Sequence, residues 1–252
     1  TVHNLGQNFS KAFEIEFLKP DGTHEYVWQT CYGISERVIA ALISVHGDDR
    51  GLILPPNVAP IQIVIIPIPY KGVEEVVDKM CREIYNVLKE AGFRVKYDDR
   101  EDMTPGSKFY DWEPRGVPIR VEIGPKDVEE KTITISRRDT LERTKCKVDE
   151  AVQMLTKVME DVQAKLKERA WSWFKSKTFR VNSLAKAQEK LEKERGIIEI
   201  PWCGSEECGL KAGEEIDARV LGEAIDITEK VIDKCVVCGK EATKILRLAK
   251  TY

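Results

Sequence analysis

Four cysteines near the C-terminus constrain the fold more than any other feature of these 252 residues. They form two close pairs, Cys203 with Cys208 and Cys235 with Cys238. Each pair can form a tight turn that directs two thiolates at one point, and glycines beside both pairs ease such turns. Four soft sulfur ligands in a tetrahedral array suit Zn²⁺ and leave no coordination position open for a substrate. We predict one structural zinc ion; iron and four free thiols are the alternatives.

The other three cysteines, Cys31, Cys81 and Cys146, are scattered, and the chain carries no signal segment. In such a chain, close cysteine pairs favour metal binding over disulfides, so we place the protein in the cytosol. Cys81 and Cys146 lie in or beside helical patterns and are expected to be buried or incidental. Cys31 lies at a strand end next to Gly33. It either lines a pocket there or has no functional role, and its position alone does not decide between the two.

Charge and hydropathy limit the classes of partner. The formal net charge is -3 and the pI is about 5.8, which argues against nonspecific coating of nucleic acid but allows a local basic face. The longest apolar run, residues 61–68, is far below the roughly 18 residues that a membrane span needs. We therefore expect no membrane partner and a globular chain long enough for two domains.

The first 58 residues predict a hairpin followed by a helix. Phe13–Phe17 alternates like a half-buried strand, Lys19–Thr23 is a turn, and His24–Tyr32 is a second strand. A helix with one apolar stripe then runs from Gly33 to Gly47, with Arg37 in its first turn. A helix N-terminus and a guanidinium suit a phosphate-bearing ligand, although an ordinary solvated arginine is equally compatible. The stripe contains Ile34, Val38, Ala41, Leu42 and Val45.

The middle of the chain alternates between strand and helix patterns, which predicts an α/β unit with a mostly parallel or mixed sheet. A proline-rich connector, Pro55–Pro60, marks the boundary before it. The expected strands are 61–68, 93–97, 117–123 and 132–136, and the expected helices are 73–91 and 148–167, with a short helix or loop at 104–116.

From about Lys165 the chain becomes basic and aromatic. Residues 165–180 carry six positive charges with interleaved tryptophans and phenylalanines, and a charged helix at 184–195 follows. This stretch either contacts an RNA backbone or is an interdomain helix whose Trp171 and Phe174 pack against the zinc-bearing part. We favour packing for the aromatic residues and leave the role of the lysines open.

Several segments together resemble class II prolyl-tRNA synthetases of the archaeal and eukaryotic type. The resemblance covers essentially the whole chain, including the cysteine quartet. It implies a fold of the α/β and α+β classes: the end of the antiparallel catalytic sheet with motif 3 (1–58), a mixed-sheet α/β anticodon-binding domain (59–167) and a small zinc-binding α/β domain (168–252). The segments are TVHNLGQNFSK (1–11), WQTCYGISER (28–37), HGDD (46–49), LPP (54–56), TPGSKF (104–109), GVPIRVEIGPKD (116–127) and AKTY (249–252).

The resemblance also implies ligand-binding roles near the N-terminus. Arg37 would stack on the adenine of ATP, supplied as its magnesium complex, and reach its terminal phosphate, while hydroxyls bind the rest of the nucleotide. A second group would bind proline, with His3 contributing a side chain and two residues shaping a small pocket floor. The implied ATP-binding residues are Thr1, Ser35 and Arg37, and the implied proline-binding residues are His3, Cys31 and Gly33.

Proline anticodons contain two guanines, and each guanine presents two adjacent N–H donors and an O6 acceptor on its Watson–Crick edge. A carboxylate can accept both donors, a cation can bind O6, and an aromatic ring can stack on the base. The residues that match the family's anticodon contacts are Phe109, Glu113, Arg120, Lys126 and Asp127. Ordinary surface charge is the competing interpretation.

These implications make the chain part of a proline–tRNA ligase with proline, ATP and tRNA(Pro) as partners, and a homodimer in the full enzyme. Motif 1, the motif 2 arginine and a Thr-x-Glu loop do not occur in these residues. We therefore expect a C-terminal half that contributes no catalytic residue of its own and does not activate proline alone. The alternatives are a non-catalytic tRNA-binding or assembly module and another class II synthetase, against which Thr1–His3 and Leu5–Phe9 argue.

Overall fold

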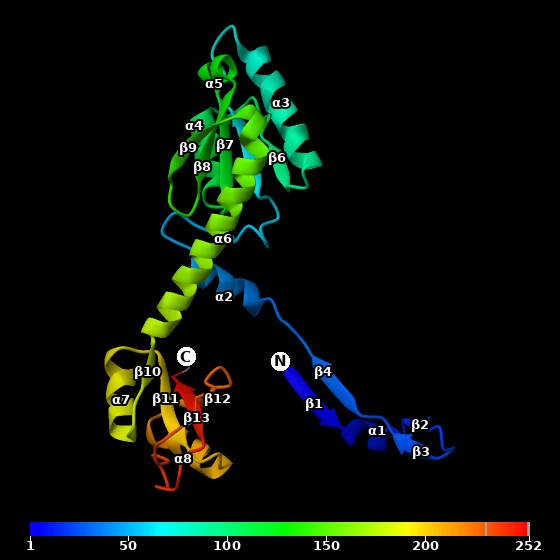
Figure 1. Cartoon of the computed structure of the whole chain (residues 1–252), viewed down its shortest axis with the longest axis vertical. Coiled ribbons are helices and arrows are strands. Elements are labelled where there is room, and N and C mark those ends of the chain that lie inside the picture. The colour runs from blue at the N-terminus through cyan, green and yellow to red at the C-terminus, as the bar shows by residue number, and fades with distance from the viewer. Residues whose placement is uncertain (230, 251–252) are drawn as a thin grey trace. The chain divides into compact units, whose positions relative to one another are not determined.

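The computed structural model describes residues 1–229 and 231–250 and forms two compact units, 1–163 and 164–252 (Figure 1). Thr251 and Tyr252, the end of the resembling AKTY segment, lie outside the described residues. None of the helices in the described ranges is long and apolar enough to cross a membrane. The three-domain division at 58/59 and 167/168 stays a prediction.

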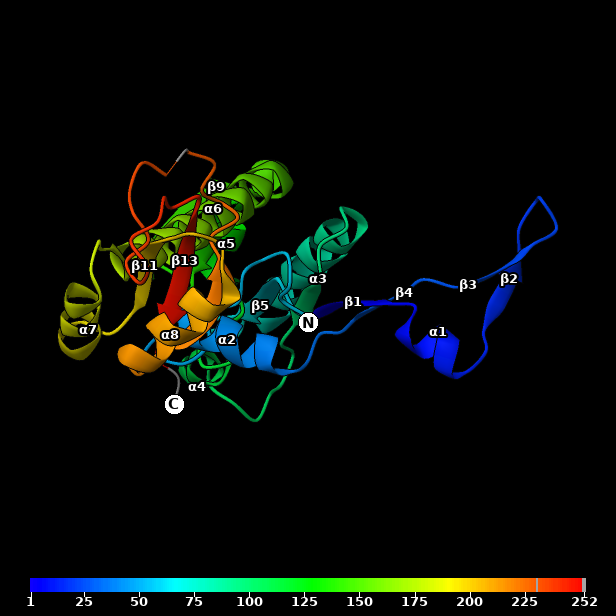
Figure 2. The same cartoon turned by 90° about the horizontal axis from the view of Figure 1, so that it is seen from below.

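Two antiparallel strand pairs begin the first unit (Figure 2). The predicted strand at 13–17 is largely wrong: Phe13 ends a short helix and is 70% exposed, and the strand begins only at Glu16. The predicted strand at 24–32 is two strands, the first completing the hairpin and the second pairing with the N-terminal strand. The elements are β1 (Val2–Gly6), α1 (Asn8–Ala12), β2 (Glu16–Leu18), β3 (His24–Tyr26) and β4 (Gln29–Tyr32).

Helix α2 (Arg37–His46) ends just before Gly47, as expected, but it begins at Arg37 and not at Gly33, so Ile34 lies outside the helix. Its apolar stripe is not covered, because the helix has no buried residue and the Val38 side chain is half exposed. An apolar stripe on a helix normally packs against a core. No other element of the described chain covers the stripe of α2.

A five-stranded mixed sheet with the order β6-β5-β7-β8-β9 forms the centre of the first unit. Strand β5 is parallel to β6 and β7, and the last two strands are antiparallel to their neighbours. This confirms the mixed α/β sheet. The strands are β5 (Ile63–Pro67), β6 (Val95–Tyr97), β7 (Ile119–Ile123), β8 (Thr132–Arg137) and β9 (Arg143–Lys147).

The helices of this unit follow the sequence pattern with three differences. Helix α5 was not predicted, and α6 continues to Ser176 instead of ending near residue 167. The third difference is the edge strand β9, which was not predicted either. On α3, Val76 and Val87 are exposed, whereas Cys81 is fully buried, in agreement with the expectation for this cysteine. The helices are α3 (Glu74–Glu90), α4 (Pro105–Trp112), α5 (Pro125–Glu130) and α6 (Ala151–Ser176), the last preceded by a 3₁₀ turn at Val148–Glu150.

Side-chain alternation gives the sheet two different faces. On one face, the core isoleucines of β5, β7 and β8 are completely or almost completely buried. On the other face, the register places Val64, Arg120, Ser136 and Arg143 in one row across β5, β7, β8 and β9. The second face is therefore polar from β7 to the edge of the sheet, as is common where strands pair antiparallel.

The second unit contains the C-terminal part of α6, a four-stranded sheet with the order β10-β11-β13-β12, and two further helices. A core of leucine, isoleucine and alanine joins the helices to the sheet. The Phe174 ring centroid lies 5.7 Å from the guanidinium of Arg247 on β13, which agrees with packing of Phe174. Trp171 lies edge-on to Phe174 but is 51% exposed, so the expected packing applies to it only in part. The elements are β10 (Thr178–Arg180), α7 (Leu184–Lys193), β11 (Ile197–Trp202), α8 (Glu206–Glu215), β12 (Arg219–Glu223) and β13 (Lys244–Ala249).

Candidate functional site

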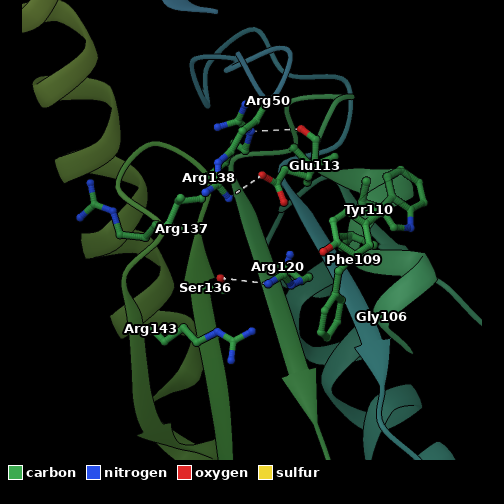
Figure 3. A pocket seen from close by; sticks show the side chains of 14 residues that line it. Arg50, Gly106, Phe109, Tyr110, Glu113, Arg120, Ser136, Arg137, Arg138 and Arg143 are labelled. Carbon is green, nitrogen blue, oxygen red and sulfur yellow. Dashed lines mark hydrogen bonds and ion pairs between the residues drawn. The ribbon is translucent and has the colours of Figure 1, made fainter. Parts of the chain in front are cut away.

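A cavity of about 290 Å³ opens between α4 and the polar face of the five-stranded sheet (Figure 3). Val64, Val117 and Trp112 belong to the small apolar cluster beneath it. Five arginines and a single carboxylate, that of Glu113, line the cavity. Its volume is at the small end for ligand pockets, so it fits one planar group rather than a large molecule.

Phe109 and Arg120, two predicted site residues, lie together in this cavity. The Arg120 guanidinium is 4.0 Å from the centroid of the Phe109 ring. It is oriented by a 2.9 Å hydrogen bond from its Nε to Glu122 and by a 3.3 Å hydrogen bond to Ser136. The two groups cover each other's facing surfaces, so a nucleobase can stack on the opposite face of the ring or of the guanidinium.

Glu113, the third predicted residue, lies on the same cavity immediately after α4. Its Oε1 accepts a 3.1 Å hydrogen bond from Arg50, and its backbone carbonyl accepts one from Arg138. Arg138 also donates to both carboxylate oxygens of Asp48. These hydrogen bonds from Arg138 are the largest cause of the low pKa of Asp48, about 2. The HGDD loop therefore fixes one wall of the cavity.

Buried polar contacts hold α4 in place. Asp98 is 1% exposed; it accepts a 2.7 Å hydrogen bond from the Trp112 indole and two from the Arg100 guanidinium. Burial alone would raise its pKa, but these donors outweigh burial and lower the pKa to about 2. At the start of the helix, Thr104 accepts a hydrogen bond from the backbone of Ser107 and caps the N-terminus. Both ends of α4, and with them Phe109 and Glu113, are positioned from outside the helix.

Lys126 and Asp127 lie at a different opening, of about 650 Å³, where β5 and β7 end. Asp127 is 8% exposed and caps α5 by accepting a 3.0 Å hydrogen bond from the Gly124 backbone. It also accepts from Thr132 and Thr134 and pairs with Lys145 at 3.3 Å. Thr134 and Lys145 are cross-strand neighbours on β8 and β9, so this second opening lies along the same polar face.

The residues predicted to bind ATP and proline lie on and after the β1–β4 ribbon. His3 is directly opposite Cys31, and Thr1 exchanges two backbone hydrogen bonds with Gly33. Opposed residues share a face of an antiparallel pair, so these four residues form one exposed patch. Ser35 and Arg37 follow at the start of α2, also exposed.

The four C-terminal cysteines meet at one point, as predicted. Their sulfur atoms all lie within 4.8 Å of one another. Burial alone would raise the pKa of Cys235, but backbone N–H groups of the two turns outweigh it and lower the pKa to about 7. Burial, together with hydrogen bonding to neighbouring cysteines, raises the pKa of Cys208 to about 12. Four sulfur atoms that meet in this way form a donor set that fits Zn²⁺.

Sequence analysis missed several residues of the first cavity. Arg50, Arg138 and Arg143 line it, and Asp48 supports it. Asp48 and Arg50 precede the predicted boundary at 58/59, so the cavity draws on both sides of that boundary. Arg138 follows β8 and Arg143 begins β9, and the pairing of these two strands was not readable from the sequence. The alternation RTKCK at 143–147 is a weak strand signal that could have indicated β9.

Two family models match this chain. "Anticodon binding domain" matches residues 62–158, which contain both openings on the polar face. "Prolyl-tRNA synthetase, C-terminal" matches residues 184–252, which contain the cysteine cluster.

Similar proteins are found over the whole chain. It is 52% identical to a proline–tRNA ligase of Ignicoccus hospitalis and 50% identical to one of Pyrococcus abyssi, with 100% of this chain and 53% of each relative covered. A crystal structure of prolyl-tRNA synthetase from Cryptosporidium parvum, complexed with halofuginone and AMPPNP, superimposes with a TM-score of 0.90 at 36% identity and covers 100% of this chain and 52% of that one. A second structure, with L-proline and AMP, gives 0.88. The chain spans about half the length of the curated relatives it matches.

Proposed function

Because this chain belongs to the prolyl-tRNA synthetase family and matches its C-terminal half, we propose that it serves a proline–tRNA ligase by reading the anticodon of tRNA(Pro). The ligase would activate proline with ATP and transfer it to the tRNA. The observation that carries the proposal is the cavity in which Phe109, Glu113 and Arg120 meet within the matched anticodon-binding region.

The cavity has the chemistry that a guanine requires. The base would stack on Phe109, and its two N–H donors would be accepted by Glu113, whose Oε2 makes no hydrogen bond within the described residues. Arg50 or Arg120 would supply the cation for O6. Lys126, with Asp127, would serve the neighbouring base at the second opening, although the capping contacts of Asp127 already use both of its oxygens.

Replacing Glu113 by alanine tests this proposal. In a ligase that also carries the upstream catalytic segment, we expect kcat/KM for tRNA(Pro) to fall by about 10- to 100-fold, because two donors of the base lose a charged acceptor. Proline-dependent ATP–pyrophosphate exchange should be unchanged, since activation does not involve the anticodon. Glu83→Ala, an exposed glutamate on α3, is the control. Equal losses in both assays for Glu113→Ala would reject an anticodon role.

We further propose that the cysteine cluster binds one structural zinc ion. Cys203, Cys208, Cys235 and Cys238 would fill a tetrahedral shell, so the ion would neutralise the thiolates and crosslink β11 and α8 to the loop before β13. A closed shell leaves no position for substrate activation.

Residues on and after the β1–β4 ribbon are also proposed to contribute to binding proline and ATP. We propose Thr1, Ser35 and Arg37 for ATP, bound with magnesium, and His3, Cys31 and Gly33 for proline; the shared exposed face of the ribbon supports the grouping. The exposed apolar stripe of α2 supports a covering segment from the remainder of a longer enzyme. A cytosolic homodimer is proposed from the family alone.

A further inference from the structure

The edge strand β9 carries a row of cations along the polar face of the sheet. Arg143, Lys145 and Lys147 occupy alternate positions, so their side chains lie on the same side of the strand. The residue between the last two, Cys146, is buried opposite Ile133. The register places the three cations in line with Ser136, Thr134 and Thr132 of β8.

Two of these cations connect the openings described above. Arg143 lines the cavity that holds Phe109, Glu113 and Arg120, and Lys145 lines the opening that holds Lys126 and Asp127 (Figure 3 shows Arg143). Alternate residues of a strand are about 6.6 Å apart, a spacing of the order of that between successive phosphates in an extended RNA strand.

The cations of β9 are accessible, unlike most arginines of the first cavity. The side chain of Arg143 is 55% exposed and pairs with Glu122 at 3.3 Å, whereas that of Arg138 is 4% exposed and fixed by Asp48. Lys145 is half exposed and pairs with Asp127 and Glu130. An exposed arginine with one partner keeps donors for a phosphate oxygen.

We propose that Arg143, Lys145 and Lys147 bind the phosphates of a single-stranded RNA segment whose bases enter the two openings. This inference rests on the proposed anticodon function and extends it, because it assigns the backbone contacts that set the register of the strand. Phosphate contacts position an RNA, and contacts to base edges specify it. The cations therefore contribute affinity that depends on salt and is independent of anticodon sequence.

Charge on an edge strand has a second known use, which is to prevent pairing with another copy of the sheet. The two roles predict different behaviour when the charges are removed. Loss of an RNA contact weakens binding without changing the oligomeric state, whereas loss of edge protection produces self-association without weakening binding.

The test measures binding of the 252-residue chain to the anticodon stem-loop of tRNA(Pro) across a salt series. The triple variant is Arg143→Gln, Lys145→Gln and Lys147→Gln. Each phosphate contact in a single strand contributes roughly 0.7 to the slope of log affinity against log salt, so the loss of three contacts should make the slope shallower by about 2. At low salt, each removed charge should weaken binding by about two- to fivefold.

The matched control removes the same charges from α3, through Arg82→Gln, Lys79→Gln and Lys89→Gln, all of which are exposed. This control and the variant Arg143→Lys, which keeps the charge, should retain the wild-type slope. The proposal would be overturned if the β9 triple variant kept the wild-type slope and melting temperature. It would also be overturned if the α3 control lost as much slope as the β9 variant, or if the β9 variant self-associated without binding the RNA more weakly. A second RNA, in which the anticodon guanines are replaced, separates phosphate binding from guanine recognition. The β9 triple variant should lose affinity equally for the original and the replaced RNA. Glu113→Ala should instead lose the preference for the original RNA over the replaced one.

Discussion

At the scale of single residues, the candidate site depends on side chains that never reach the ligand. Asp98 orients Trp112 and Arg100 behind α4, and Asp48 holds Arg138 against the carbonyl of Glu113. The resemblance named Phe109, Glu113 and Arg120 before the fold was known, and the structure places these three residues in one cavity. Their supports could not be predicted, because Asp48 and Arg138 are 90 residues apart and only the fold brings them together.

Replacing Asp98 by asparagine tests this support. The ordinary carboxyl pKa of 3.8 is lowered to about 2 in the fold, so ionised Asp98 stabilises the folded state fully above about pH 4, and this stabilisation is lost as the pH falls toward 2. Asp98→Asn should lower the free energy of unfolding at pH 7 by about 2 kcal/mol. Denaturant unfolding at pH 7 and pH 3 measures this. A variant equally destabilised at both values would contradict the assigned pKa.

At the scale of elements, the strongest periodic patterns were predicted and the short or irregular ones were not. The buried run of β5 and the apolar face of α3 specify their elements through long hydrophobic patterns. Strand β9 and helix α8 were missed because polar residues dominate both elements. Helix α5 was missed because its six residues form less than two turns, too few for a periodic pattern. The predicted meeting of the four cysteines is confirmed, because thiol spacing constrains the fold independently of periodicity.

Removal of the metal should destabilise the second unit selectively. Purified protein is expected to contain about one zinc ion per chain, and Cys203→Ser or chelation should lower the melting temperature by about 10 °C or more, since structural zinc contributes many kcal/mol. Cys31→Ser, at an exposed cysteine outside the cluster, should leave the melting temperature unchanged. A metal-free preparation that melts like the wild type would contradict the zinc assignment.

At the scale of the whole molecule, the described residues hold three separate features, each suited to a different part of the proposed function. A polar sheet face with two openings is suited to reading RNA, a cysteine cluster is suited to a structural ion, and an exposed ribbon is suited to completing a site with residues from elsewhere. The apolar stripe of α2 is exposed, so this pattern indicates a contact that the described chain does not make.

The most direct test of the central claim compares guanine with inosine in the anticodon stem-loop of tRNA(Pro). Inosine lacks the exocyclic amino group, so a carboxylate that accepts two donors from guanine accepts only one from inosine. We predict that the 252-residue chain binds the RNA about tenfold more weakly when inosine replaces the guanine held by Glu113, and that Glu113→Ala abolishes the difference. Equal affinity of the wild-type chain for the guanine and inosine RNAs at both anticodon positions would contradict recognition by Glu113.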